Sequence, residues 1–319
     1  MKRSSKVPAG FKDVLLVDYL AARFTYLPAA TWRDWVTNGR LTRNGQRCGV
    51  TTRVQPGDMV TCNMPDFDPP SVNLDVGIIY EDDWLLAVNK PPGLRVHSQG
   101  KFVTANLIYY LRHQHEPPYP AAQLVNRLDA DTSGVVVLAQ DKAAARALGT
   151  LFSQHEVEKR YIALVQGQPQ PASGIIDYPL RKVPGTKVAR HEVAKEGAGK
   201  TAVTHYQTLE TFGSAYALLQ LQPVSGRTHQ LRVHLAASGH PLVGDGLYQL
   251  DDAGFLDWVR NGRSSATIPL LQRQALHCAV TQFPHPVTGA NCRLEAPLPS
   301  DMAQLIERLQ TETTGVEQK

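Results

Sequence analysis

A proline-rich, acidic stretch divides this chain into two unequal parts. The segment NMPDFDPPSVN, residues 63–73, contains consecutive prolines, which exclude both a helix and a central β-strand. We therefore interpret residues 67–73 as a linker between a small N-terminal domain, residues 1–66, and a large domain, residues 74–319. The chain length of 319 residues also favours about two domains.

The N-terminal part combines helices, a hairpin and positive charge. Residues 11–24 and 30–39 carry apolar side chains at helical spacing, and Asn44-Gly45 between two extended runs indicates a hairpin. Up to Cys62 the chain has ten Lys and Arg against four Asp, a net charge of +6, whereas the whole chain carries +4. Such a basic module is expected to contact a polyanion, although a solvated basic face without a partner fits the charge equally well.

Extended apolar runs dominate the large domain, at GVVVLA, RYIALVQG and AYALLQLQPV, and helices are expected at KAAARALGTLF and THQLRVHLAASG. Strands outnumber helices and do not alternate regularly with them. The predicted fold class is therefore α+β, with a large, mostly antiparallel mixed sheet. Residues 181–200 are mostly basic and lack periodicity, which indicates either a mobile loop or an exposed hairpin tip.

Several protein classes do not fit the composition. The basic start imitates a signal peptide, but Lys12, Asp13 and Asp18 interrupt its apolar stretch. No run approaches the ~18 apolar residues of a membrane span. The four cysteines lack Cys-x-x-Cys spacing, so no metal site is expected, and unpaired cysteines suit a reducing compartment. We expect a cytoplasmic monomer without a membrane partner.

The stretch VNRLDADTSGVVVLAQ, residues 125–140, places two carboxylates before an apolar strand. A calcium loop beginning at Asp129 and Asp131 would need a glutamate at its twelfth position, where the chain has Gln140. A surface turn is a second interpretation, because Asp, Thr, Ser and Gly are turn formers and Asp141 can cap the helix that follows. An active site is the third.

The order of several sequence blocks bears on this choice. NRLD is followed by DTSGVVVLAQDKAAARAL, KRYIALVQG, SGRTHQLRVHLAASGHPLVGDGLY and ALHC, with KPPGLRVHS upstream. Together these blocks resemble the RNA pseudouridine synthases of the RluA type over most of residues 73–299. The N-terminal stretch WRDWVTNGRLTRNG, with VQPGDMV after it, resembles the small RNA-binding domain of the ribosomal S-four type. That second resemblance implies RNA contacts from basic side chains at Arg33, Arg40, Arg43 and Arg47.

The first resemblance implies an enzyme that isomerises uridine to pseudouridine in structured ribosomal or transfer RNA. It assigns Asp129 to the ribose, Arg232 to an ion pair with that carboxylate, and Tyr161 to the uracil ring. Glycoside chemistry likewise needs a carboxylate beside the anomeric carbon, and a fixed cation would offset the rise in its pKa on burial. The reaction involves no net redox change, so no cofactor is expected.

Four further residues are expected to bind the target nucleotide. The resemblance implies that Leu231 and Leu276 line the pocket, and Arg127 lies close enough to Asp129 to fill the gap that a flipped uridine leaves. Asn126 stands where the family usually has histidine, and asparagine cannot titrate. This departure is the one feature that favours the alternative of a non-catalytic RNA-binding or ribosome-assembly protein.

Two other interpretations of the titratable residues can be weighed from spacing. A glycosidase-like hydrolase would use Asp129 and Asp131 as its acid and base, but two residues on one turn are poorly placed to flank one bond. His229 and His234 are five residues apart and do not share a helix face. We expect these histidines to make structural hydrogen bonds and not to bind a metal.

Overall fold

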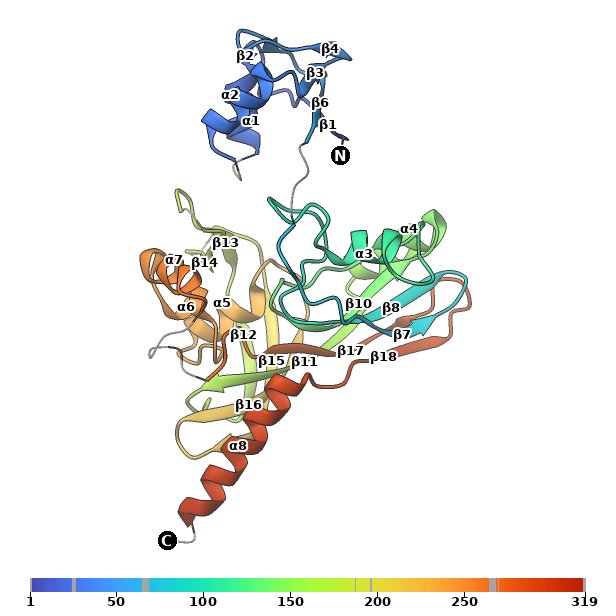
Figure 1. The fold of residues 1–319 in the computed structure, drawn as a ribbon. Coiled ribbons are helices and arrows are strands. Elements are labelled where there is room, and N and C mark those ends of the chain that lie inside the picture. The colour runs from blue at the N-terminus through green and yellow to red at the C-terminus, as the bar shows by residue number, and fades with distance from the viewer. Residues whose placement is uncertain are drawn as a thin grey trace. The chain divides into compact units, whose positions relative to one another are not determined.

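The structure is a computed structural model that describes residues 2–24, 27–64, 69–186, 188–195, 197–263, 268 and 270–317. The chain forms two compact units (Figure 1). One comprises Met1–Ser71 with Ser98–Ala105, and the other comprises Val72–His97 with Asn106–Lys319. Residues 67 and 68 of the predicted linker lie outside the described residues.

The N-terminal unit contains two helices and a small antiparallel sheet. The helices are α1 (Leu16–Arg23) and α2 (Ala29–Thr37), and the sheet has the order β1-β6-β3-β4. Its strands, with a separate β2/β5 pair, are β1 (Lys2–Lys6), β2 (Val14–Leu15), β3 (Leu41–Arg43), β4 (Gln46–Arg47), β5 (Arg53–Val54) and β6 (Met59–Asn63). Asn44 and Gly45 both have positive φ, as the predicted two-residue hairpin between β3 and β4 requires.

The first helix begins later than its apolar spacing predicts. Val14–Leu15 pairs with β5 instead of joining the helix, and Asp13 has a φ of 57°, outside the right-handed helical region. The helix predicted over residues 30–39 ends at Thr37, and Gly39 (φ 68°) follows it as the expected stop. Pairing with a distant strand is a tertiary effect that helical periodicity cannot reveal.

The larger unit is built on one sheet with the order β12-β15-β16-β11-β17-β10-β8-β7, to which β18 adds on β17 and β9 on β10. Its strands are β7 (Gly77–Glu81), β8 (Leu85–Lys90), β9 (Gln123–Leu124), β10 (Ser133–Ala139), β11 (Glu158–Gln166), β12 (Ser173–Asp177), β15 (Val203–Phe212), β16 (Tyr216–Pro223), β17 (Leu276–Pro284) and β18 (Asn291–Glu295). All pairs in this sheet are antiparallel except β10 with β17. The predicted α+β class with a mostly antiparallel mixed sheet is confirmed.

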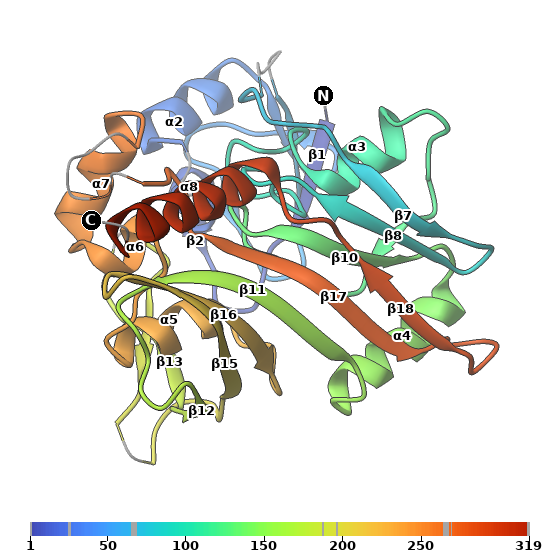
Figure 2. The same cartoon turned by 90° about the horizontal axis from the view of Figure 1, so that it is seen from below.

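Helices pack on both faces of this sheet. They are α3 (Leu107–His113), α4 (Lys142–Ser153), α5 (Gln230–Ala237), α6 (Gly246–Gln249), α7 (Asp252–Arg260) and α8 (Ser300–Glu317). Viewed from below, α8 crosses in front of the sheet, whereas α4 and α5 lie behind it (Figure 2). Side chains of β11 therefore point alternately to the two faces. Ala163 and Val165 belong to the apolar cluster that includes residues of α5, and Leu164 belongs to the cluster that includes residues of α8.

The basic segment 181–200 contains a short hairpin in its described part. Leu180–Lys182 (β13) pairs antiparallel with His191–Val193 (β14). The described part of the segment thus contains a hairpin, in which the residues of β14 are half-buried.

Candidate active site

Asp129 lies in the loop between β9 and the central strand β10. Hydrogen bonds from the backbone and from two basic side chains hold this loop: Thr132 N–H donates to the Asp129 carbonyl at 3.2 Å, and Lys90 Nζ donates to the Ala130 carbonyl at 2.9 Å. Arg273 Nη1 donates to the carbonyl of Asp131 at 3.2 Å. Three successive carbonyls are thus each satisfied by a different donor, which fixes the backbone that carries Asp129.

Gly134 permits the close approach of strands just after this loop. Its φ is +113°, and a Cβ built there would lie 2.2 Å from the carbonyl oxygen of Cys278 in β17. Any side chain at this position would push β10 away from β17. The glycine of the motif therefore serves the parallel pairing beside the site.

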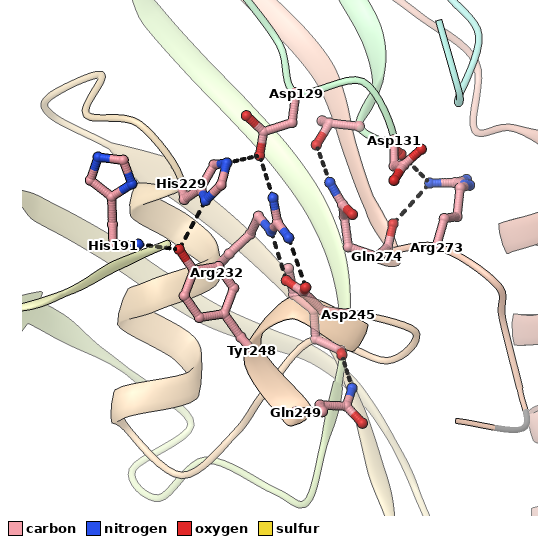
Figure 3. A network of polar contacts seen from close by, with 12 residues as sticks. Asp129, Asp131, His191, His229, Arg232, Asp245, Tyr248, Gln249, Arg273 and Gln274 are labelled. Carbon is pink, nitrogen blue, oxygen red and sulfur yellow. Dashed lines mark hydrogen bonds and ion pairs between the residues drawn. The ribbon is translucent and has the colours of Figure 1, made fainter. Parts of the chain in front are cut away.

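Arg232 on α5 meets Asp129 directly (Figure 3). Its Nη1 donates to Asp129 Oδ2 at 2.9 Å, while Nε and Nη2 donate to the two oxygens of Asp245 at 2.7 and 2.8 Å. Both Arg232 and Asp245 are buried, and the guanidinium carbon lies 5.1 Å from the ring centroid of Tyr248. The sequence predicted the ion pair between Arg232 and Asp129, and the structure brings these two residues together.

The network determines the charge of Asp129. Burial alone would raise the pKa of this carboxyl, but the ion pair and hydrogen bond with Arg232 leave its pKa below the ordinary value. Arg232 is itself held in the charged form, because Asp245 and Asp129 outweigh the effect of burial and raise its pKa. Asp129 is therefore a carboxylate at neutral pH within a largely buried site.

Tyr161 lies on the same face of β11 as Ala163, on the α5 side of the sheet, just after a β-bulge at Arg160/Tyr161. Burial raises the pKa of its hydroxyl well above the ordinary value, and the adjoining Cys278 thiol and the Asp129 carboxylate act in the same direction. Tyr161 is thus a protonated phenol near Asp129, and its packing on the uracil stays a prediction.

The two predicted pocket leucines are buried. Leu231 is 6% exposed and Leu276 is 4% exposed, and both belong to the apolar cluster against which Tyr161 packs. They therefore lie in the same apolar cluster as the tyrosine ring. Contact with a substrate stays a prediction for both leucines.

Asn126 and Arg127 differ in exposure. Asn126 is half-buried, and its Oδ1 accepts a hydrogen bond from the backbone N–H of Val137 at 2.8 Å. That side chain thus supports β10. Arg127 is exposed and is close enough to His97 to help lower the pKa of that histidine, after burial as the main cause. Arg127 is accordingly placed to meet a ligand from solvent.

Asp131 is oriented away from the Asp129 network. Its carboxylate pairs with Arg263 at 2.9 Å, a different cation from the one that Asp129 binds. The residue after the loop continues into strand β10 and not into a helix, so an EF-hand arrangement is not formed. Among the described residues, no three His, Cys, Asp or Glu side chains converge as metal ligands would.

Sequence reasoning missed two members of the site and one approach of a third. Asp245 and Tyr248 stand in the GDGLY stretch that follows α5, but nothing in their spacing indicates a contact with Arg232. His229 makes a hydrogen bond of 2.9 Å with the Tyr248 hydroxyl, yet its Nε2 also lies 3.8 Å from Asp129 Oδ2. His234, by contrast, bonds Thr204 and the Tyr178 carbonyl, as expected of a structural histidine.

The four arginines predicted to bind RNA lie in the N-terminal unit. Arg33 is exposed on α2, and Arg40 follows that helix in a half-buried position. Arg43 and Arg47 lie on the two strands of the β3/β4 hairpin, and Arg43 Nε lies 3.8 Å from Asp58 Oδ2. RNA binding by these side chains stays a prediction.

A family model and curated relatives both match this chain. Residues 84–237 match the family model described as RNA pseudouridylate synthase. The ribosomal large subunit pseudouridine synthase D of Xylella fastidiosa is 34% identical, over 98% of this chain and 93% of that protein. The protein of the same name from Escherichia coli strain K12 is 35% identical, over 90% of this chain and 88% of its own length.

Solved structures agree. Human RNA pseudouridylate synthase domain containing 4 aligns with a TM-score of 0.58 at 30% identity, covering 73% of this chain and 93% of that chain. Human RNA pseudouridylate synthase domain containing 1 aligns with a TM-score of 0.55 at 26% identity, over 76% and 98%. In the part of the chain that the structure describes, no helix is long and apolar enough to cross a membrane.

Proposed function

The chain belongs to the RNA pseudouridine synthase family, and we propose that Asp129 is the carboxylate with which it acts on the ribose of its target uridine. The enzyme is an isomerase: it breaks the bond between the base nitrogen and the ribose, turns the base, and joins ring carbon 5 to the sugar. The observation that carries the proposal is the ion pair of Asp129 with Arg232. It supplies an ionised carboxylate in a site that also holds Tyr161.

Arg232 supports the chemistry by keeping Asp129 charged and oriented. Asp245 holds the guanidinium through Nε and Nη2, so Nη1 donates to Asp129 from one fixed orientation. Lysine, a point charge on a flexible stem, cannot bond both carboxylates in this way. An ionised Asp129 can form a bond to the anomeric carbon or accept a proton from the ribose, and both routes are open to it.

Tyr161 is proposed to pack its ring on the uracil. Its hydroxyl stays protonated at neutral pH, because burial raises its pKa. In that state the hydroxyl can donate or accept a hydrogen bond near carbon 5, where the final proton leaves. Leu231 and Leu276 would complete the apolar side of the same pocket.

We propose large-subunit ribosomal RNA as the substrate, with transfer RNA as the alternative. The support is the function that the relatives from Xylella fastidiosa and Escherichia coli carry in their names. Residues 1–66 would act as an S-four-like RNA-binding domain through Arg33 and Arg47, and residues 74–319 as the catalytic domain. The enzyme would work as a monomer in the cytoplasm, where ribosomal RNA is accessible before assembly is complete.

Neither of the two alternative functions explains the ion pairs of this site. A non-catalytic RNA-binding protein has no use for a half-buried Asp129 held in the charged form by Arg232, and Asn126 has a structural role in bonding Val137. A hydrolase that used Asp129 with Asp131 would need both carboxylates on one bond, whereas each pairs with a different arginine.

Mapping pseudouridine in cellular RNA tests the proposed substrate. Ribosomal and transfer RNA from cells with and without the gene would be compared, with the gene carrying Asp129→Asn restored as a control. Loss of specific large-subunit sites in both the deletion and the control supports the proposal. Loss confined to transfer RNA would replace the proposed substrate with the alternative.

A further inference from the structure

His229 occupies a strained backbone position beside the proposed catalytic carboxylate. Its φ of 57° and ψ of 18° lie in the left-handed region, which few residues other than glycine adopt, asparagine, aspartate and histidine most often among them. The residue immediately precedes α5, and its imidazole points toward Asp129 (Figure 3). Its Nε2 lies 3.8 Å from Asp129 Oδ2, the same oxygen that Arg232 binds. Backbone strain of this kind is often kept where a side chain serves a function.

Tyr248 can set which imidazole nitrogen carries the proton. The Tyr248 hydroxyl accepts a hydrogen bond from the backbone N–H of His191 at 3.1 Å, which leaves its own proton available for donation to His229 Nδ1 at 2.9 Å. A neutral imidazole that accepts at Nδ1 bears its proton on Nε2. The nitrogen that faces Asp129 is therefore a donor.

We propose that His229, in the tautomer set by Tyr248, is a positioning residue that donates to Oδ2 of Asp129 when RNA is bound. Arg232 and His229 would then occupy Oδ2 together, so that Oδ1 is the oxygen presented to the ribose. The separation of 3.8 Å is longer than a hydrogen bond, and such bonds commonly shorten when substrate fills the site. This inference rests on the proposed role of Asp129.

The surroundings keep His229 neutral. Its pKa is lowered to about 4, mainly by burial; Asp129 and Asp245 favour the charged ring, while Arg232 and His191 oppose it. Tyr248, the other group that faces the imidazole, has its pKa raised above the ordinary value by burial and remains a hydroxyl. Near neutral pH the ring is therefore a single-proton donor and not a second cation beside Arg232.

A double-mutant cycle tests the inference. Tyr248→Phe removes only the hydroxyl and keeps the ring that faces Arg232, and His229→Asn keeps a residue that tolerates the left-handed backbone. Each variant should lower kcat for release of the carbon 5 proton by about tenfold to a hundredfold, with RNA affinity within twofold. If Tyr248 acts through His229, the double variant should lose no more than His229→Asn alone.

Tyr119→Phe is the matched control. It also removes one hydroxyl bond to another side chain, at Glu81, and should leave kcat unchanged. The inference is overturned if His229→Asn leaves kcat unchanged, if the two losses multiply, or if Tyr119→Phe is equally slow. When the wild type is active and Asp129→Asn is inactive, any of these results overturns the proposed role of His229 and leaves the proposed role of Asp129 intact. An active Asp129→Asn variant would overturn both proposals.

Discussion

Asp245 holds Arg232 through two hydrogen bonds, from Nε at 2.7 Å and from Nη2 at 2.8 Å, with only 1% of Asp245 exposed. Arg232 is thereby fixed before its third nitrogen reaches Asp129. Removal of Asp245 would leave the arginine free to turn, although Asp129 itself would be unchanged. The proposed catalytic carboxylate thus depends on a second carboxylate that does not touch it.

Arg232→Lys should lower kcat by about tenfold to a hundredfold and shift its pH dependence. Asp129 must be ionised, and Arg232 holds its pKa below the ordinary value, so activity persists as the pH falls until Asp129 is protonated. A lysine cannot hold Asp245 through two parallel hydrogen bonds while it also donates to Asp129, so the pKa of Asp129 should rise and the acidic limb of kcat should move to higher pH. Steady-state rates measured across the pH range check this. An unmoved acidic limb would show that Arg232 does not set the charge of Asp129.

Asp301→Asn should destabilise the protein by about 2 kcal/mol, because it removes the partly exposed counter-charge of the buried Arg273. Arg273 also binds the Asp131 carbonyl, so kcat should fall as the loop that carries Asp129 loosens. Denaturant unfolding and proton-release rates measure the two effects.

Glu312→Gln, on the same helix, serves as the control for Asp301→Asn. Its exposed pair with Arg308 spans 3.8 Å, and its loss should change stability by about 0.5 kcal/mol or less. Equal effects of the two substitutions would rule out a special role for the bond between Arg273 and Asp301.

Arg33→Gln combined with Arg47→Gln should weaken RNA binding and flatten its dependence on salt. For each phosphate that the protein no longer neutralises, the slope of log affinity against log salt falls by roughly 0.7 to 0.9. The value of kcat at saturating RNA should not change. Arg308→Gln, an exposed arginine of α8, is the control. A salt slope like that of the wild type would mean that the N-terminal charge is only a solvated surface.

Arg127→Ala should slow the reaction most on a uridine that is stacked in folded RNA. The target base must be flipped out at a cost of a few kcal/mol, and an exposed guanidinium beside the site can fill the gap that it leaves. A uridine that is already mispaired or unstacked should be affected much less. Single-turnover rates on the two substrates would distinguish the roles. Equal losses that shrink at low salt would indicate a phosphate contact only.

Local patterns predicted much of the fold. Continuous apolar runs located strands β10 and β11 of the large sheet, and Asp141 caps α4 as its position suggested. Pairing between distant segments was not predictable in this way. Strand β2 replaces the first turn of the expected helix because β5, about forty residues later, supplies its partner. Strand β1 likewise depends on pairing with β6.

The candidate site was also predictable only in part. Asp129, Tyr161 and Arg232 were found through the order of the sequence blocks, and the structure brings Arg232 to Asp129. Asp245 was missed because its role arises from a turn that returns the chain to Arg232. His229 makes a structural hydrogen bond with Tyr248, as expected, but its approach to Asp129 was not predictable because helical spacing carries no information about the orientation of its ring.

Release of the carbon 5 proton by Asp129→Asn tests the central proposal most directly. Asparagine preserves the size of the side chain but cannot carry the charge that Arg232 stabilises. RNA whose uridines carry a labelled hydrogen on carbon 5 would be incubated with each protein, and RNA affinity would be measured on the same samples. We expect no proton release above background from the variant, with RNA affinity within a few-fold of the wild type. Substantial release by Asp129→Asn would contradict the proposed role of this carboxylate.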